Sequence, residues 1–264
     1  MGVFDSDGLR VEQRGGLLLL TITREARRNA LDAATSRAVD AMIERAEQDP
    51  DIAVTIITGT GDRAFCSGMD MKEAASMGAG NGLIPGRGFA GITERQRTKP
   101  LIAAINGTAV AGGFEIALAC DIILAADHVM FGLSEVKRGM FAFAGGIQRL
   151  SRQIPRSAAM SIILTGETVS AARLYELGVV SEILPGAELM ARAIELGEMI
   201  ASYSQAAVRN AKLLHDLSSA MPVEHSLSFG MAFGKATLHS ADSREGIAAY
   251  TEKRDTRYGE RDQG

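Results

Sequence analysis

The sequence predicts an α/β fold followed by a purely helical region, within a chain of 264 residues. Up to about Leu184, short apolar segments of strand length alternate with segments whose apolar residues recur at helical spacing. From about Pro185 onward only the helical spacing remains. A chain of this length suits one large domain, or a core domain with a smaller appendage.

The N-terminal part shows the alternation of strand and helix first. Residues 17–23 (LLLLTIT) are apolar and follow a glycine pair, which is typical of a buried strand. Residues 32–48 begin with Asp32, a side chain suited to cap a helix, and carry apolar residues at helical spacing. Residues 52–58 (IAVTIIT) form the next buried strand. This order of strand, helix and strand indicates an α/β arrangement.

The middle of the chain continues the pattern around a glycine-rich loop. Residues 76–91 are predicted to be a loop, and residues 86–91 within it formally match GxGxxG. A dinucleotide site is disfavoured because that fingerprint requires a strand directly before it. After the loop, 101–105 is a predicted strand, 114–120 a helix and 121–125 another strand.

Four helices are predicted at the C-terminal end, over residues 186–202, 204–219, 223–239 and 243–255. We divide the chain into a core of residues 1–195, which carries the site, and a helical oligomerisation region of residues 196–264. The third helix holds more large apolar residues than one exposed helix needs, namely Leu227, Phe229, Met231 and Phe233. Self-association or packing within the chain would cover them.

Composition excludes several classes of function. The chain has 28 Lys and Arg residues against 32 Asp and Glu residues, a formal net charge of −4, so it lacks the basic field typical of nucleic-acid binding. Two cysteines make no disulfide framework, and the four histidines show no metal spacing, so we expect no metal. The N-terminus has no apolar targeting region, and we expect a cytoplasmic protein that does not enter a membrane.

Two glutamates are the strongest candidates for chemistry. Glu115 lies in the first turn of an otherwise apolar helix, two residues after Ala111-Gly112-Gly113. Burial there would raise its pKa, which suits acid–base catalysis, and the paired glycines and helix start could hold a developing oxyanion. Glu135 follows 20 residues later, and the intervening strand would let both carboxylates converge on one pocket. Complementing a helix dipole and starting an ordinary helix are the alternative explanations.

Residues 64–72 (AFCSGMDMK) form a second candidate segment. Gly68 allows a sharp bend after which the N–H of Met69 could point into a pocket. Cys66 is disfavoured as a nucleophile because no histidine lies near it in sequence.

These segments together resemble the enoyl-CoA hydratase (crotonase) family. The similarity runs from about Arg24 to Arg254 and includes AFCSGMDMKE, KPLIAAINGTAVAGGFEIALACDIILA, FGLSEVKRG, AGGIQRL, LTGETVSAARLYELGVVSEI and SREGIAAYTEKR. It implies a spiral core of repeated ββα units, a helical trimerisation region, and a homotrimer or dimer of trimers. It also implies that the partner is an acyl-CoA thioester. No metal or redox cofactor is implied, since coenzyme A is part of the substrate.

The resemblance also implies roles for individual residues. The backbone N–H groups of Met69 and Gly112 would hold the thioester oxygen, Glu115 would help activate water, and Glu135 would supply a proton to C2. The implied contacts to coenzyme A or the acyl group are Arg27, Ala64, Ser67, Asp70, Met71, Lys72, Phe143 and, at a neighbouring subunit's site, Lys253.

Three residues or pairs depart from the usual pattern of the family. Glu25 stands where proline often follows the arginine, Met69 replaces a small residue, and Ala142-Phe143 replaces Pro-Gly. Met69 and Phe143 would reshape or narrow the pocket. These departures favour a different acyl group or a different reaction, whereas the resemblance implies a hydratase because family members with that activity carry glutamates at the positions of both Glu115 and Glu135. The leading hypothesis is a 2-enoyl-CoA hydratase, with an isomerase or a related hydratase/dehydratase acting on an unusual acyl-CoA as the alternative. From another functional class, a non-catalytic acyl-CoA-binding protein is the third.

Overall fold

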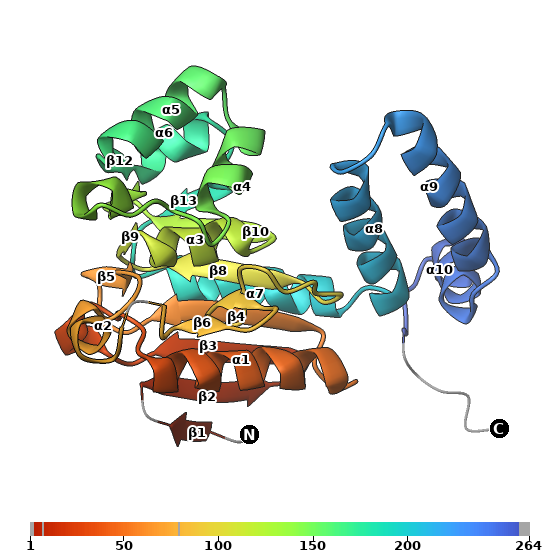
Figure 1. Cartoon of the computed structure of the whole chain (residues 1–264). Helices are drawn as coiled ribbons and strands as arrows, with labels where there is room; N and C mark the ends of the chain where they lie inside the picture. The colour runs from red at the N-terminus through yellow and green to blue at the C-terminus, as the bar shows by residue number, and fades with distance from the viewer. Residues whose placement is uncertain (1–2, 7, 79, 259–264) are drawn as a thin grey trace.

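A computed structural model describes residues 3–6, 8–78 and 80–258 of the chain (Figure 1). The larger sheet has seven strands in the order β1-β2-β3-β4-β8-β10-β13. Their bounds are Val3–Ser6, Leu9–Arg14, Leu17–Ile22, Val54–Gly59, Leu101–Ile105, Ile122–Ala126 and Glu182–Leu184. A smaller sheet has the order β12-β11-β9-β5, with bounds Val169–Ser170, Met130–Gly132, Thr108–Val110 and Ala64–Cys66.

Successive pairs of strands divide themselves between the two sheets. The first strand of each pair, β4, β8 or β10, lies in the larger sheet, and the second, β5, β9 or β11, lies in the smaller one. Neighbouring strands β3, β4, β8, β10 and β13 all run parallel. The helices between them are α1 (Ala33–Gln48), α2 (Met71–Met77), α3 (Gly112–Ala119) and α4 (Gly146–Gln153). This repetition confirms the predicted spiral of ββα units.

The predicted elements of the core lie where expected, with shifts of a few residues at their ends. Asp32 caps α1, as predicted, by accepting a hydrogen bond of 2.8 Å from the backbone N–H of Thr35. The glycine-rich segment predicted as a loop contains a short hairpin, β6 (Leu83–Ile84) paired with β7 (Gly88–Phe89). Turns rather than a helix follow this hairpin, so the GxGxxG match is not a dinucleotide fingerprint.

The C-terminal helices fall into two groups. After α5 (Arg156–Thr165) and α6 (Ala171–Glu176), helix α7 (Leu189–Ala201) packs on strands β3, β4, β8 and β10. The predicted boundary at residues 195/196 therefore falls inside a helix of the core. Helices α8 (Gln205–Ser218), α9 (Val223–Leu238) and α10 (Ala241–Glu252) project from this core (Figure 1). Lys212 of α8 joins them to the core through an ion pair of 2.7 Å with Asp121.

Packing within the chain leaves part of α9 uncovered. Leu227 is 64% exposed, Phe229 48% and Met231 62%. Among the described residues, no helix combines the length and apolar character that crossing a bilayer requires.

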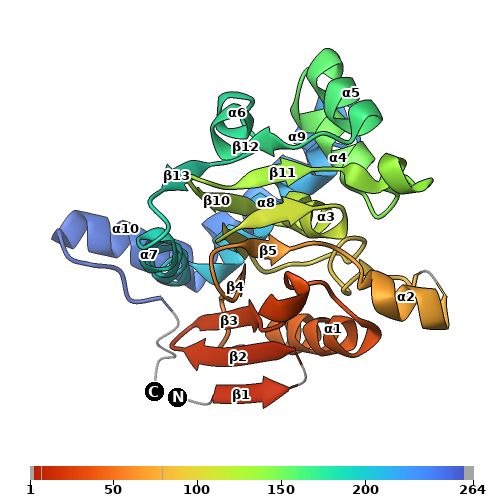
Figure 2. The ribbon, with the colours of Figure 1, turned by 90° about the vertical axis from the view of Figure 1, so that its left-hand side faces the viewer.

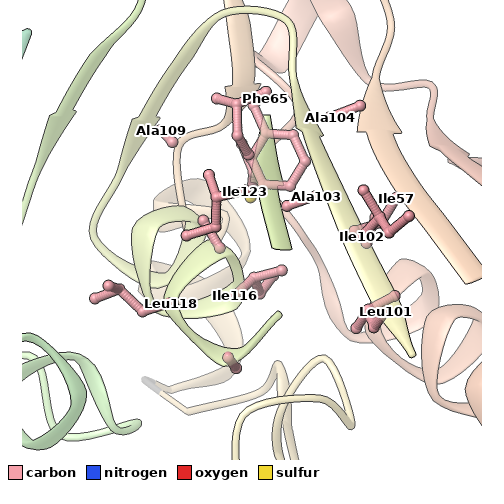
Figure 3. Close-up of a cluster of buried hydrophobic side chains, with 14 of the residues drawn as sticks. Ile57, Phe65, Leu101, Ile102, Ala103, Ala104, Ala109, Ile116, Leu118 and Ile123 are labelled. Atoms are coloured by element: carbon pink, nitrogen blue, oxygen red, sulfur yellow. The ribbon is translucent and has the colours of Figure 1, made fainter. Parts of the chain in front are cut away.

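The buried core joins both sheets to α3 (Figure 3). Phe65 of β5, Ala103 of β8 and Ile116 of α3 are completely buried in one continuous cluster. Every residue of α3 is buried, which explains the nearly continuous apolar sequence of this helix. The helix that carries Glu115 is therefore fixed on all sides.

Gly113 shows how closely α3 approaches β5. A Cβ atom at this position would lie 2.0 Å from the carbonyl oxygen of Cys66, a backbone atom that cannot move away alone. We expect Gly113→Ala to lower the melting temperature by at least about 5 °C, because a forced shift of this helix costs about 2 kcal/mol or more.

The matched control for Gly113→Ala is Gly234→Ala in α9, where a Cβ would meet no described atom within 4 Å. This control should leave the melting temperature unchanged or slightly higher, because alanine favours the helix. Equal melting temperatures for the two variants in thermal denaturation would contradict the proposed role of Gly113.

Candidate active site

The turn before α3 leaves the backbone N–H group of Gly112 unpaired within the described part of the chain. Ala111 adopts φ 51° and ψ −131°, a conformation that a residue with a Cβ rarely occupies. Gly112, which follows it, has no room for a side chain because a Cβ would lie 2.6 Å from the ring of Phe89. Among the described residues, the N–H groups of Gly112 and Met69 have no hydrogen-bond acceptor. Strain at Ala111 thus accompanies an unpaired amide at the start of a buried helix.

Glu115 lies one turn into this helix and is only 5% exposed. Its Oε1 accepts a hydrogen bond of 3.0 Å from the backbone N–H of Gly146, the first residue of α4. Burial is the main cause that raises the pKa of Glu115 to about 7, and the negative charge of Glu135 raises it further. Backbone N–H groups at Gly146 and Ala144 and the Arg149 guanidinium act in the opposite direction.

Glu135 belongs to a short 3-10 helix, η2 (Ser134–Arg138). Both of its carboxylate oxygens are buried, and neither has a hydrogen-bond partner among the described residues. Burial raises the pKa of Glu135, while the nearby Arg138 opposes this rise. A buried carboxylate without a partner is unfavourable unless another molecule supplies one. Glu135 is therefore available for a proton or a ligand.

Both glutamates line one cavity of about 560 Å³. Met69 and Gly112 line it too, so the two unpaired amides and the two carboxylates share the same space. Figure 2 shows α2 below and the chain between β11 and α4 above, on the same side of the molecule as the N-terminal end of α3. The structure thus brings together the four residues predicted for catalysis and for the oxyanion hole.

Most of the other predicted contacts also line the cavity, namely Arg27, Ser67, Asp70, Met71, Lys72 and Phe143. Two do not. Ala64 is buried in β5, where its carbonyl accepts a hydrogen bond of 2.7 Å from Asn29 Nδ2. Lys253 is the C-cap residue that follows α10 and lies outside this cavity, so its predicted role at a neighbouring subunit stays a prediction.

The departures from the family pattern have structural consequences. Met69 is half-buried, and its Sδ accepts a hydrogen bond of 3.3 Å from Gly80 N. Phe143 is 49% exposed and packs edge-on against Phe141 with ring centroids 5.9 Å apart, so it lies at the rim of the cavity rather than plugging it. Arg24 pairs with Asp70 at 3.0 Å, and Asp70 in turn caps α2.

Several lining residues were not predicted from the sequence, including Leu83, Phe89, Arg138, Met140 and Phe141. A further residue, Arg149, lies on α4 one turn after Gly146 and donates a hydrogen bond of 2.5 Å to the carbonyl of Thr93. The sequence signal for Arg149 is its spacing from Gly146, but this spacing has meaning only once Gly146 is known to bind Glu115.

Comparison with known proteins defines the class of protein. A sequence profile described as enoyl-CoA hydratase/isomerase matches residues 12–261. The chain therefore belongs to the enoyl-CoA hydratase/isomerase family and is an enzyme of the crotonase superfamily.

Individual relatives resemble the chain over nearly its full length. A carnitinyl-CoA dehydratase of Escherichia coli is 37% identical, with 95% of this chain and 97% of that relative aligned. The crystal structure of enoyl-CoA hydratase EchA1 from Mycobacterium marinum is 40% identical with a TM-score of 0.89, covering 95% of this chain and 98% of that one. The structure of a carnitinyl-CoA hydratase from Mycobacterium avium is 36% identical with a TM-score of 0.77, covering 97% of this chain and 100% of that one.

The raised pKa of Glu115 predicts a pH-dependent stability. A carboxyl whose pKa rises from 4.5 to about 7 on folding binds more protons when folded, so its contribution to stability falls as pH rises through this interval. The loss amounts to up to about 3 kcal/mol. Glu115→Gln should therefore be more stable than the parent at pH 8 and nearly equal to it at pH 5, measured by urea unfolding.

The control for this stability experiment is Glu176→Gln on α6, whose carboxylate pairs with Arg173 at the surface. The difference between this control and the parent should not change between pH 5 and pH 8. A stability difference for Glu115→Gln that is the same at both pH values would refute the inferred pKa.

Proposed function

We propose that the protein catalyses the reversible addition of water across the C2–C3 double bond of a trans-2-enoyl-CoA thioester. The observation that supports this function is the pairing of Glu115 and Glu135 on one cavity beside the unpaired amides of Met69 and Gly112. Hydration needs a base for the water, an acid for C2 and donors for the thioester oxygen. The cavity offers one group for each of these roles.

The proposed mechanism begins with the thioester oxygen bound by the N–H groups of Met69 and Gly112. Ionised Glu115 accepts a proton from water while the water oxygen bonds to C3, and the π electrons move onto the thioester to form an enolate. Protonated Glu135 then gives its proton to C2, producing a 3-hydroxyacyl-CoA. Burial raises the pKa of both carboxyls, so the pair can share one proton near neutral pH. The reactive state in this proposal is the one in which that proton lies on Glu135. The reverse sequence removes water.

The coenzyme A part of the substrate is assigned to the edge of the cavity formed by Arg27, Arg28 and Lys72. These exposed cations suit the phosphates of coenzyme A. Hydration involves no net oxidation or reduction, so the proposed mechanism uses no redox cofactor. In this mechanism the N–H groups of Met69 and Gly112 stabilise the charge on the thioester oxygen, so it uses no metal either.

A dehydratase acting on an unusual acyl-CoA is the second candidate. It is favoured by the relatives named carnitinyl-CoA dehydratase, which match this chain over about its whole length. The same two glutamates would serve it in the reverse direction. An isomerase would need only Glu135, and a binding protein neither carboxylate, so the hydrogen bond that Gly146 donates to buried Glu115 favours the two-carboxylate reaction.

We also propose that the protein acts in the cytoplasm as a homotrimer or a dimer of trimers. Leu227 and Met231 lie one turn apart on α9, and Phe229 lies on another side of the helix; all three are exposed apolar side chains that neighbouring copies would cover. Replacing Phe229 and Met231 by aspartate should shift the assembled species to monomer in light scattering coupled to size-exclusion chromatography. Monomeric parent protein would refute the proposed assembly.

The hydratase proposal is tested by incubating the protein with crotonyl-CoA, longer trans-2-enoyl-CoAs and carnitinyl-CoA. Loss of the conjugated absorbance with formation of 3-hydroxyacyl-CoA supports hydration, and its appearance from carnitinyl-CoA supports the dehydratase. Glu115→Gln and Glu135→Gln should each lower kcat at least about 100-fold, because each removes a proton-transfer group without removing coenzyme A contacts.

Glu176→Gln is the control for these activity measurements and should retain full turnover. Free coenzyme A should bind both active-site variants nearly as well as the parent, measured by calorimetry. Full activity in either Glu115→Gln or Glu135→Gln would rule out the two-carboxylate mechanism.

A further inference from the structure

Arg138 is a cation on the cavity for which the proposed reaction gives no role. It ends η2, the short helix that carries Glu135, and it lines the cavity. Its neighbour Lys137 is engaged in an ion pair of 2.7 Å with Glu167. Within residues 3–6, 8–78 and 80–258, by contrast, Arg138 makes no ion pair and no side-chain hydrogen bond, although its charge lowers the pKa of the nearby Glu135. The guanidinium is therefore available to a ligand in the cavity.

The position of Arg138 indicates which part of the substrate it meets. In a 3-10 helix, residues three apart lie on the same side, so Arg138 and Glu135 share one side of η2. The cations assigned to coenzyme A come from the other edge of the cavity, Lys72 from α2 and Arg27 from η1 (Glu25–Arg27). Figure 2 shows α2 and the chain between β11 and α4 separated on this side of the molecule. Arg138 thus lies near Glu135, the residue proposed to protonate C2 of the acyl chain.

The surroundings of Arg138 suit a chain with an apolar middle and a charged end. Met140, Phe141 and Phe143 follow η2 and line the same cavity, and the two aromatic rings contact each other. Their exposed faces could cover methylene groups. A guanidinium binds a carboxylate through two parallel hydrogen bonds. A lysine ammonium in place of the guanidinium cannot form this paired contact, and an acyl chain with an apolar end offers no acceptor for it.

We propose that Arg138 selects acyl-CoA thioesters whose acyl chain ends in a carboxylate. This inference rests on the proposed function, since that function places the thioester at Met69 and Gly112 and the reacting carbons at the glutamates. The acyl atoms beyond C3 then extend along η2 toward the guanidinium. A chain ending in a quaternary ammonium would instead meet a like charge there.

Binding of saturated acyl-CoAs tests the selectivity without requiring turnover. Calorimetry should compare glutaryl-CoA, which ends in a carboxylate, with pentanoyl-CoA, which has the same number of acyl carbons and a methyl end. We expect the parent to bind glutaryl-CoA about tenfold more tightly, as a charge-assisted pair at a partly exposed site allows. Arg138→Met should abolish this preference, and Arg138→Lys should retain part of it.

Lys137→Met is the matched control, because Lys137 lies on the same helix but pairs with Glu167 away from the ligand. It should keep the full preference for glutaryl-CoA. Circular dichroism should show parent-like folding for Arg138→Met, because the side chain is exposed and makes no ion pair within the described ranges.

Three results would overturn the inference. The parent could bind both acyl-CoAs equally, or Arg138→Met could keep the preference. Alternatively, Arg138→Met could weaken free coenzyme A as much as glutaryl-CoA, which would place a phosphate rather than the acyl carboxylate at Arg138. If the protein prefers glutaryl-CoA but hydrates no enoyl-CoA, only the proposed function is refuted. If it hydrates enoyl-CoAs without the preference, only this inference is refuted.

Discussion

The hydrogen bond from the backbone N–H of Gly146 to Glu115 is the contact on which the arrangement of the cavity depends. Glu115 lies in a buried apolar helix. A carboxyl group in such surroundings needs a hydrogen-bond donor to offset the free energy lost when it leaves water. Gly146 can approach because it lacks a side chain, since a Cβ would lie 2.9 Å from Glu115 Cγ. This hydrogen bond links α3 to α4 and so orients the carboxylate. The chain between η2 and α4 also returns to the cavity at this point.

The same region holds a second unfavourable feature, the backbone conformation of Ala111. A residue with a Cβ at positive φ stores about 1–3 kcal/mol that surrounding packing must offset. The packing of α3 supplies that compensation, because the helix is buried along its whole length and Gly113 contacts β5 directly. The result is an amide at Gly112, on the lining of the cavity, that has no acceptor among the described residues. The backbone strain thus lies beside the part of the cavity that the amides of Met69 and Gly112 line.

Periodic patterns were enough to predict most of the core, because apolar strands such as 52–58 and the capped helix after Asp32 are determined by local sequence. The convergence of Glu115 and Glu135 was predictable too, since the strand between them had to return to the same edge. The positions of Arg138 and Arg149 near the two glutamates were not predictable, because they depend on which residues lie one helical turn away or on a neighbouring element. The hairpin β6–β7 was missed because its strands have two residues each, too short for any periodic signal. The boundary at 195/196 divided α7 because amphipathic spacing does not reveal which surface a helix covers.

The charge of one arginine acts on each of the two carboxylates, which helps to explain how the cavity can hold both. Arg149 lies on α4 behind Glu115 and lowers its pKa, while Arg138 lies on η2 beside Glu135 and lowers the pKa of that residue. Burial acts more strongly than either cation, so both pKa values remain raised. The two arginines differ in one respect, because Arg149 donates to the carbonyl of Thr93 and Arg138 has no such partner among the described residues. A cation held by the backbone can only tune its carboxylate, whereas one that is free to pair can also bind a ligand. Arg149 therefore places a fixed positive charge near Glu115, whereas the positive charge of Arg138 near Glu135 can also bind a ligand.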